Sequence, residues 1–169
     1  MKRNIFFWMA VTLVVSAAVV TAVVWFGQGP GRFNTDVAKH IHKLCAGRSS
    51  CQVHLRDLFS YSEPWDRVYI FEPSASQELI TSKVGDGVAT ADLLRTIVLM
   101  KGSYVIYQEH APRGVESPLA NQINLDCPDK GSDWVMCQAD ALLYVQESIT
   151  NGDPATDRTR GHSYKLKSQ

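Results

Sequence analysis

Hydrophobic positions are unevenly distributed along the chain, and one long apolar run stands apart from the rest. Ile5–Phe26 contains no charged side chain and only three polar ones. As a helix this run is about 33 Å long, close to the bilayer hydrocarbon core of about 30 Å. Lys2 and Arg3 precede it, so the positive-inside rule places residues 1–4 in the cytoplasm. The pattern predicts a transmembrane signal-anchor helix over 5–26, with the rest of the chain exported.

A cleaved signal peptide is the alternative interpretation of this run. Such a peptide has an apolar region of about 7–15 residues that ends at a small-residue cleavage site. Val20-Thr21-Ala22 is a weak site of this kind, but apolar residues continue beyond it to Phe26. Both interpretations place the following residues outside the cytoplasm. A Gly-rich spacer over 27–31 then leads into the exported part.

Two helices are predicted in the exported part. Apolar residues repeat at helical spacing between Asn34 or Thr35, either of which can cap a helix, and Gly47, which can end it. The second helix is predicted over Ser74–Lys83, with Ser74 or Ser76 as its N-cap. The remaining apolar residues do not follow a helical period.

β-Branched and aromatic residues predict five strands, at Gln52–Leu55, Arg67–Glu72, Thr96–Met100, Tyr104–Glu109 and Ala141–Gln146. The third and fourth are joined by Lys101-Gly102-Ser103, which strongly indicates a hairpin. Arg67–Glu72 is nearly all apolar, which indicates burial on both faces. Loops are expected over 56–63 and 114–133, and a disordered tail over 151–169. We therefore predict an α+β domain over 32–150, with one antiparallel or mixed sheet of four to five strands and two helices.

The charge balance and the pattern of apolar residues after Phe26 exclude some classes of protein. No second apolar run approaches the length of about 18 residues needed to span a bilayer, which excludes a polytopic transporter. The chain has 17 basic and 17 acidic side chains, and the part after Phe26 has 15 against 17. This balance gives no sign of a nucleic-acid partner.

Four cysteines, Cys45, Cys51, Cys127 and Cys137, all lie in the exported part. An even number in an oxidising compartment predicts two disulfides, for which three connectivities exist. We favour Cys45–Cys51 and Cys127–Cys137, because each pair is close in sequence and encloses turn-like residues. A zinc site or a redox-active pair is the alternative. The six-residue step from Cys45 to Cys51 and the lack of C-x-x-C argue against both.

The histidines and aspartates of the exported part do not form a pattern that predicts a metal or cofactor. His40 and His42 are two residues apart on a helix, so they point in nearly opposite directions and cannot share one ion. Asp126, Asp129 and Asp133 lie around the second cysteine pair, and a calcium site is the alternative interpretation of this cluster, but the three residues lack the EF-hand spacing. We interpret them as a solvated acidic turn.

The chain contains no recognised catalytic motif. No phosphate-binding loop, nucleophile elbow or H-E-x-x-H pair occurs, so a non-enzymatic protein is predicted. If an unrecognised hydrolase site exists, the first residues to suspect are His110, Asp66 and Glu72.

The most informative stretch runs from Phe59 to Pro73. Trp65 can pack on the core while Asp66 binds a turn or a backbone N–H group. The functional alternative is an exposed aromatic binding patch of Phe59, Tyr61 and Trp65. The segment Trp65-Asp66-Arg67-Val68-Tyr69-Ile70-Phe71-Glu72-Pro73 resembles a W-D-x-[VIL]-[YF]-[VI]-F-x-P motif of small, mostly uncharacterised bacterial envelope proteins. The resemblance implies an envelope location and supplies no catalytic residues.

These observations lead to a functional hypothesis. We expect a single-pass protein of the bacterial inner membrane whose periplasmic, disulfide-containing domain binds another protein. An immunity or inhibitor protein is one concrete form of this hypothesis. The alternative is an accessory or structural subunit of a membrane or envelope complex, held there through the anchor helix.

Overall fold

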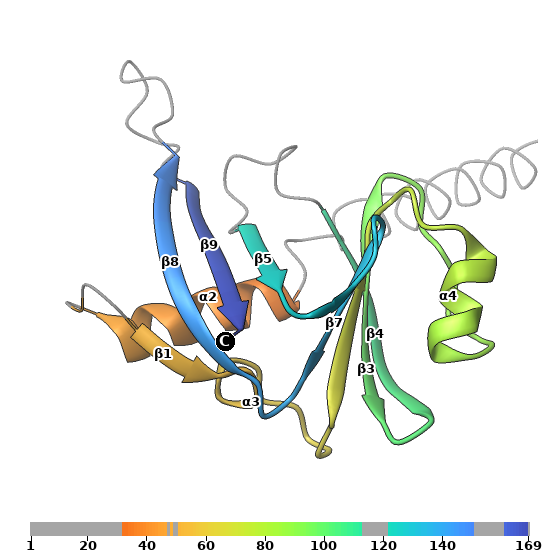
Figure 1. Ribbon diagram of the computed structural model, residues 1–169, viewed down its shortest axis with the longest axis horizontal. Coiled ribbons are helices and arrows are strands. Elements are labelled where there is room, and N and C mark those ends of the chain that lie inside the picture. Colours follow the sequence, from red (N-terminus) through yellow and green to blue (C-terminus); the bar gives the residue numbers. More distant parts are fainter. Residues whose placement is uncertain (1–31, 47, 49–50, 113–121, 151–160, 169) are drawn as a thin grey trace, which may run out of the picture.

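Two β-sheets and three helices form the part of the chain that the computed structural model describes, namely residues 32–46, 48, 51–112, 122–150 and 161–168 (Figure 1). The expected anchor over 5–26 and the spacer over 27–31 lie outside these residues. Among the described helices, none is both long enough and apolar enough to cross a membrane.

The first sheet, sheet A, is mixed. Its four strands have the order β1-β8-β9-β5. β8 is antiparallel to both β1 and β9, whereas β5 runs parallel to β9 at the edge. The strands are β1 (Cys51–His54), β5 (Gln122–Asp126), β8 (Leu142–Thr150) and β9 (Gly161–Ser168).

The second sheet, sheet B, is antiparallel throughout, with the order β4-β3-β2-β7-β6. β2 lies at its centre and is buried on both faces, as its apolar sequence predicts. β3 and β4 form the predicted hairpin, in which the register shifts beside Leu99 so that Ile106 is the extra residue of a bulge. The strands are β2 (Arg67–Phe71), β3 (Leu94–Lys101), β4 (Tyr104–Pro112), β6 (Asp129–Lys130) and β7 (Trp134–Gln138).

Three helices are described: α2 (Arg32–Cys45), α3 (Leu55–Leu58) and α4 (Gln77–Val84). α2 buries Phe33, Val37 and Ile41 along one stripe. Val37 and Ile41 belong to the helical repeat seen in the sequence, whereas Leu44, its third member, is exposed. α4 begins at Gln77, after Ser76, which is one of the two predicted N-caps; the Ser76 hydroxyl accepts a hydrogen bond from the Leu79 N–H group at 3.2 Å.

The hydrophobic core lies on both faces of sheet B. On one face, α2, α3 and sheet A pack against β2 and β3, and this cluster includes Val68, Ile70 and Leu99. On the other face, α4 packs against Phe71 and Val98, which alternate along β2 and β3 with Ile70 and Leu99 of the first face. Figure 1 shows α4 on the side of sheet B that faces away from sheet A. Sheet B is therefore the central layer of the molecule.

Arg95 of β3 fixes the two sheets to each other. Its guanidinium forms an ion pair with Glu72, at the end of β2, with 2.9 Å between Nη2 and Oε1. The same group donates to the Ile123 carbonyl of β5 at 3.1 Å and to the Asn124 side chain at 3.3 Å. Because the Arg95 side chain is only 11% exposed, these bonds form with little competition from water.

The predicted fold class is wrong in its central feature. We expected one sheet of four to five strands with two helices, and the described residues instead form two sheets with nine strands and three helices. The missed strands β5, β6 and β7 fall in or beside the segment expected to be a loop. β5 pairs with β9 and β7 pairs with β2, both distant in sequence, and β6 has only two residues, so the local pattern did not reveal these strands.

The predicted disordered tail also needs correction. Gly161–Ser168 is β9, which lies between β8 and β5 in sheet A. Tyr164 is 3% exposed and Leu166 is fully buried. Alternating burial between these residues and the exposed Lys165 and Lys167 is the period of a half-buried strand. The domain therefore extends beyond the predicted boundary at residue 150.

Candidate functional site

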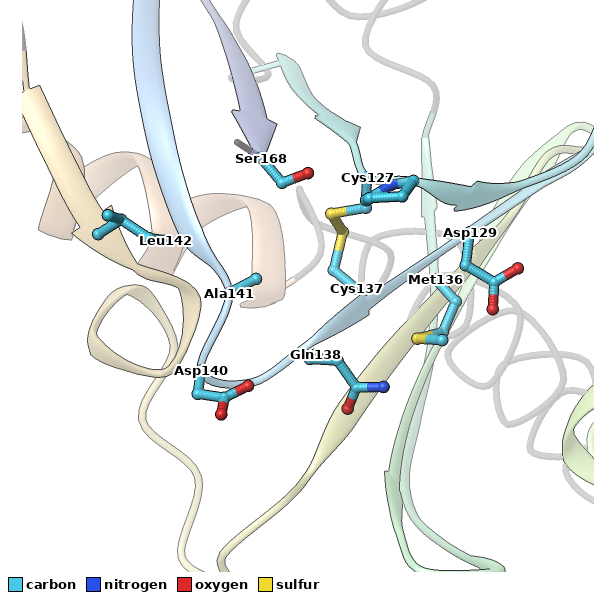
Figure 2. A pocket seen from close by; sticks show the side chains of 10 residues that line it. Cys127, Asp129, Met136, Cys137, Gln138, Asp140, Ala141, Leu142 and Ser168 are labelled. Carbon is cyan, nitrogen blue, oxygen red and sulfur yellow. A yellow bond between two sulfur atoms is a disulfide. The ribbon is translucent and has the colours of Figure 1, made fainter.

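A pocket of about 370 Å³ opens where the chain crosses between the two sheets. The chain leaves sheet A after β5, passes through Cys127 and Pro128, and enters β6 of sheet B. It returns to sheet A through the turn between β7 and β8. The residues around the pocket are Cys127, Pro128, Asp129, Met136, Cys137, Gln138, Asp140, Ala141, Leu142 and Ser168 (Figure 2). They come from both sheets, so the pocket exists only in the assembled fold.

The second disulfide forms the inner wall of this pocket. Cys127 and Cys137 are bonded, as the sequence predicts, with their Cα atoms 5.5 Å apart. Both residues are nearly fully buried. The bond ties the crossing segment after β5 to β7, which are neighbouring walls of the pocket. A covalent link at this position restricts how far the walls can separate.

The first disulfide is also formed as predicted, between Cys45 and Cys51. It joins the end of α2 to the start of β1, away from the pocket. With both pairs bonded, no free cysteine is present in the described part of the chain. The zinc and redox interpretations of these four residues are therefore not supported.

The turn between β7 and β8 is held from several sides. The Ala141 N–H group donates to the Gln138 carbonyl at 3.1 Å, which closes the turn. The Asp140 carbonyl lies 2.9 Å from Nδ1 of His54, and the Ala141 carbonyl accepts from the Leu55 N–H group at 3.1 Å. These bonds use the backbone and leave the Asp140 side chain directed to solvent. The outer wall of the pocket is therefore ordered before any ligand arrives.

Two carboxylates, those of Asp129 and Asp140, stand at the mouth of the pocket. Both residues are exposed. Figure 2 shows Asp129 on β6 and Asp140 at the turn, with Gln138 between them in this view. Neither carboxylate has a hydrogen bond or ion pair with another residue of the described chain. The pocket thus combines an apolar interior with an acidic mouth.

Two neighbouring acidic residues, Asp126 and Asp133, already form ion pairs or hydrogen bonds within the chain. Asp126 forms an ion pair with Lys130 at 2.5 Å and another with Lys165 at 3.8 Å. The hydrogen bond from Lys130 is the main reason that the pKa of Asp126 is lowered. Hydrogen bonds from Ser132 and Ser74 lower the pKa of Asp133. Asp126 and Asp133 therefore have partners within the chain, unlike the exposed carboxylates of Asp129 and Asp140.

The calcium alternative for Asp126, Asp129 and Asp133 finds no support. Asp126 contacts Lys130 and Asp133 contacts Ser74, and no group of three metal-ligating side chains converges among the described residues. On α2, Nδ1 of His40 lies 2.8 Å from the Asp36 carbonyl one turn earlier, and His42 is exposed.

The alternative of an exposed aromatic binding patch is wrong for Phe59, which is fully buried. Its ring centroid lies 5.0 Å from that of Phe33 and 5.7 Å from that of Tyr107. Tyr61 and Trp65 are half-buried and pack against the same core. These rings therefore attach α2 to sheet B, which is the structural interpretation of the stretch.

Asp66 has the turn-binding role that the sequence predicts. Its Oδ2 accepts a hydrogen bond from the Gly102 N–H group at 2.5 Å, at the tip of the β3–β4 hairpin. Gly102 has φ 59°, a conformation that favours glycine. The Asp66 backbone also donates to Met100 at 2.9 Å and accepts from Ala139 at 2.7 Å. One residue thus joins β3, its hairpin and the turn beside the pocket.

The residues suspected in a hydrolase do not form one site. Asp66 and Glu72 lie at opposite ends of β2, about 20 Å apart at the usual strand rise. Glu72 pairs with Arg95, whereas His110 contacts Thr96 on the α4 face of the sheet, with 3.2 Å between Nδ1 and Oγ1. This particular catalytic hypothesis is not supported. The broader prediction of a non-enzymatic protein stays a prediction.

Comparisons of the chain with protein-family models, curated proteins and solved structures find no match. The resemblance of the Trp65–Pro73 segment to envelope proteins therefore stays a prediction.

The pocket was not predicted from the sequence as a site. Its one visible signal was the Cys127–Cys137 pair, which brackets two of the acidic residues. Leu142 and Ser168 could not be added by local reasoning, because they reach the pocket through strand pairing across sheet A.

Proposed function

We propose that this chain is an exported protein, held at the bacterial inner membrane by residues 5–26, whose domain binds another protein through the pocket beside Cys127–Cys137. Inhibition of, or immunity to, an envelope-directed toxin or hydrolase is one form that such binding takes. The apolar length of residues 5–26 and the basic residues before them support the location.

The open pocket is the observation that carries the binding role. Small recognition sites are concave and mostly apolar, with a few polar groups that fix the orientation of what enters. This pocket meets that description, and disulfide and backbone bonds hold its walls. A surface that is ordered before binding loses less conformational entropy on binding than a flexible surface does. A segment of a partner protein that inserts one side chain fits a pocket of this size.

Site-specific photo-crosslinking in cells tests the proposal. A photoreactive amino acid is placed at Pro128 or at Gln138, both exposed and both beside the pocket, in the full chain. The control position is Ser82, which is exposed on α4 and belongs to the other side of sheet B. We expect a defined crosslinked protein from the two pocket positions and none from Ser82.

The outcomes separate the proposal from its alternatives. Equal capture from all three positions, or none from the pocket, contradicts the binding role of the pocket. Capture only from positions within residues 5–26 favours an accessory subunit that is held through its anchor. Mass spectrometry of the crosslinked product identifies the partner in either case.

A further inference from the structure

We infer that the pocket accepts a basic side chain, lysine or arginine, that projects from the partner protein. This inference rests on the proposed function and specifies the chemistry of the same site. It follows from three properties of the pocket and its surroundings: an apolar interior, two carboxylates at the mouth, and the contacts of Lys130 and Lys165 with Asp126 rather than with these carboxylates.

The interior suits an aliphatic chain. The Cys127–Cys137 disulfide, Met136, Ala141 and Leu142 present carbon and sulfur surface to the pocket (Figure 2). Lysine and arginine carry three or four methylene groups, which pack on apolar surface while the charged end remains in water. The pocket is open, so the charged end of such a side chain is not forced into a dry interior.

The mouth suits a cation. The carboxylates of Asp129 and Asp140 are exposed and are not paired with any described residue. Lys130, the residue after Asp129 on β6, and Lys165 of β9 both contact Asp126 instead. An arriving ammonium or guanidinium group therefore finds two acceptors without displacing an internal ion pair.

The same features reject the other ligand classes. An acidic side chain meets two like charges at the mouth, which opposes its entry. A neutral apolar side chain can fill the interior, but it brings no partner for the carboxylates whose hydration it disturbs. Specificity for a basic side chain thus comes from the mouth, whereas the interior supplies contact area.

Nuclear magnetic resonance of the full chain in detergent micelles tests the inference. The probes are the N-acetyl methylamides of lysine, arginine and norleucine, where norleucine has the same stem as lysine without its charge. We expect lysine and arginine to shift the backbone amide signals of Cys137, Gln138 and Leu142, and norleucine to do so at about fivefold higher concentration. The signal of Ser82 serves as the remote reference.

Charge-removing variants locate the effect. In Asp129→Asn/Asp140→Asn we expect lysine to bind about fivefold more weakly, the usual effect of losing two solvent-exposed ion pairs, and to become equal to norleucine. The matched control is Asp86→Asn/Asp92→Asn, which removes the same charge at exposed positions away from the pocket. This control should bind lysine as the native chain does.

Several results would overturn the inference. Equal binding of lysine and norleucine to the native chain would show an apolar pocket without charge selection. Equal weakening in both double variants would show a long-range charge effect. If pocket crosslinking in cells is unchanged by Asp129→Asn/Asp140→Asn, the partner enters by other chemistry, and the inference fails while the proposed function stands.

Discussion

At the level of single residues, the Trp65-Asp66 pair explains most of the informative stretch. Trp65 packs against the core, and Asp66 holds a hairpin tip through its side chain and two neighbouring segments through its backbone. Local chemistry predicted this role, because a short acidic side chain beside a strand readily binds backbone N–H groups. The partner of Asp66 could not be predicted, since Gly102 comes close only through the pairing of β2 with β3.

Replacing Asp66 should loosen the β3–β4 hairpin. We expect Asp66→Ala to lower the free energy of unfolding by about 1 kcal/mol, because its hydrogen bond to Gly102 is charged but solvent-exposed. Urea unfolding of the full chain measures this change. Asp86→Ala, an exposed aspartate in a loop, is the control and should change stability little. An equal effect of the two substitutions would contradict the role given to Asp66.

Tyr107 should make the fold sensitive to alkaline pH. Burial, the hydrogen bond that its hydroxyl donates to Glu109, and the charge of Glu109 together raise the pKa of Tyr107 above its ordinary value of 10.0. The folded chain therefore keeps this proton above pH 10, where the unfolded chain releases it. Stability from this group is complete below pH 10 and is lost as the pH rises further.

Urea unfolding between pH 8 and pH 11 should therefore show a fall in stability that Tyr107→Phe makes shallower. At neutral pH the variant should be less stable by about 1 kcal/mol, because Glu109 loses a hydrogen bond. Tyr104→Phe removes an exposed tyrosine and serves as the control. An unchanged alkaline slope in Tyr107→Phe would contradict this assignment.

At the level of elements, the sequence predicted the helices and strands whose conformation depends on residues close to them in the chain. The β3–β4 hairpin, the buried β2 and the capped α4 each follow from a short pattern, and the structure contains all three. β7 contains Met136, Cys137 and Gln138, which have weak strand preference, so its pairing with β2 decides its conformation. β9 has only Tyr164 and Leu166 as apolar positions, and burial between two other strands makes it a strand.

Leu166 should be as important to stability as a residue of any central strand. It is fully buried between β8 and β5, in the segment that sequence reasoning assigned to a disordered tail. We expect Leu166→Ala to lower the free energy of unfolding by about 2–5 kcal/mol, the usual cost of such a cavity. The neighbouring Lys167→Ala, on the exposed face, should change it by less than about 0.5 kcal/mol. A neutral Leu166→Ala would show that β9 contributes little to the fold.

At the level of the whole molecule, the candidate site and the error in the fold class have one cause. The pocket, like the division into two sheets, arises because the chain crosses from sheet A to sheet B and back around the Cys127–Cys137 bond. Cysteine spacing predicted the bond, but spacing carries no information about which strands lie on either side of it. The pocket could therefore be predicted only as a constrained loop.

The location of the domain is the remaining prediction for the whole molecule, and its test uses both the anchor and the disulfides. Residues 5–26 with Lys2 and Arg3 before them should place the C-terminal side in the periplasm. A reporter enzyme that is active only after export, fused after Gln169, should therefore be active. A reporter that is active only in the cytoplasm should be inactive at the same position.

Thiol labelling gives an independent reading of the same location. Disulfides persist in the periplasm, whereas the cytoplasm keeps thiols reduced. Without a reductant, the exported chain should therefore show no labelled cysteine, and with a reductant and denaturant all four should label. Cytoplasmic reporter activity together with four free thiols would overturn the topology. Free thiols in a chain with periplasmic reporter activity would instead contradict only the disulfides. The two measurements thus distinguish an error in the direction of the anchor from an error in the cysteine pairing.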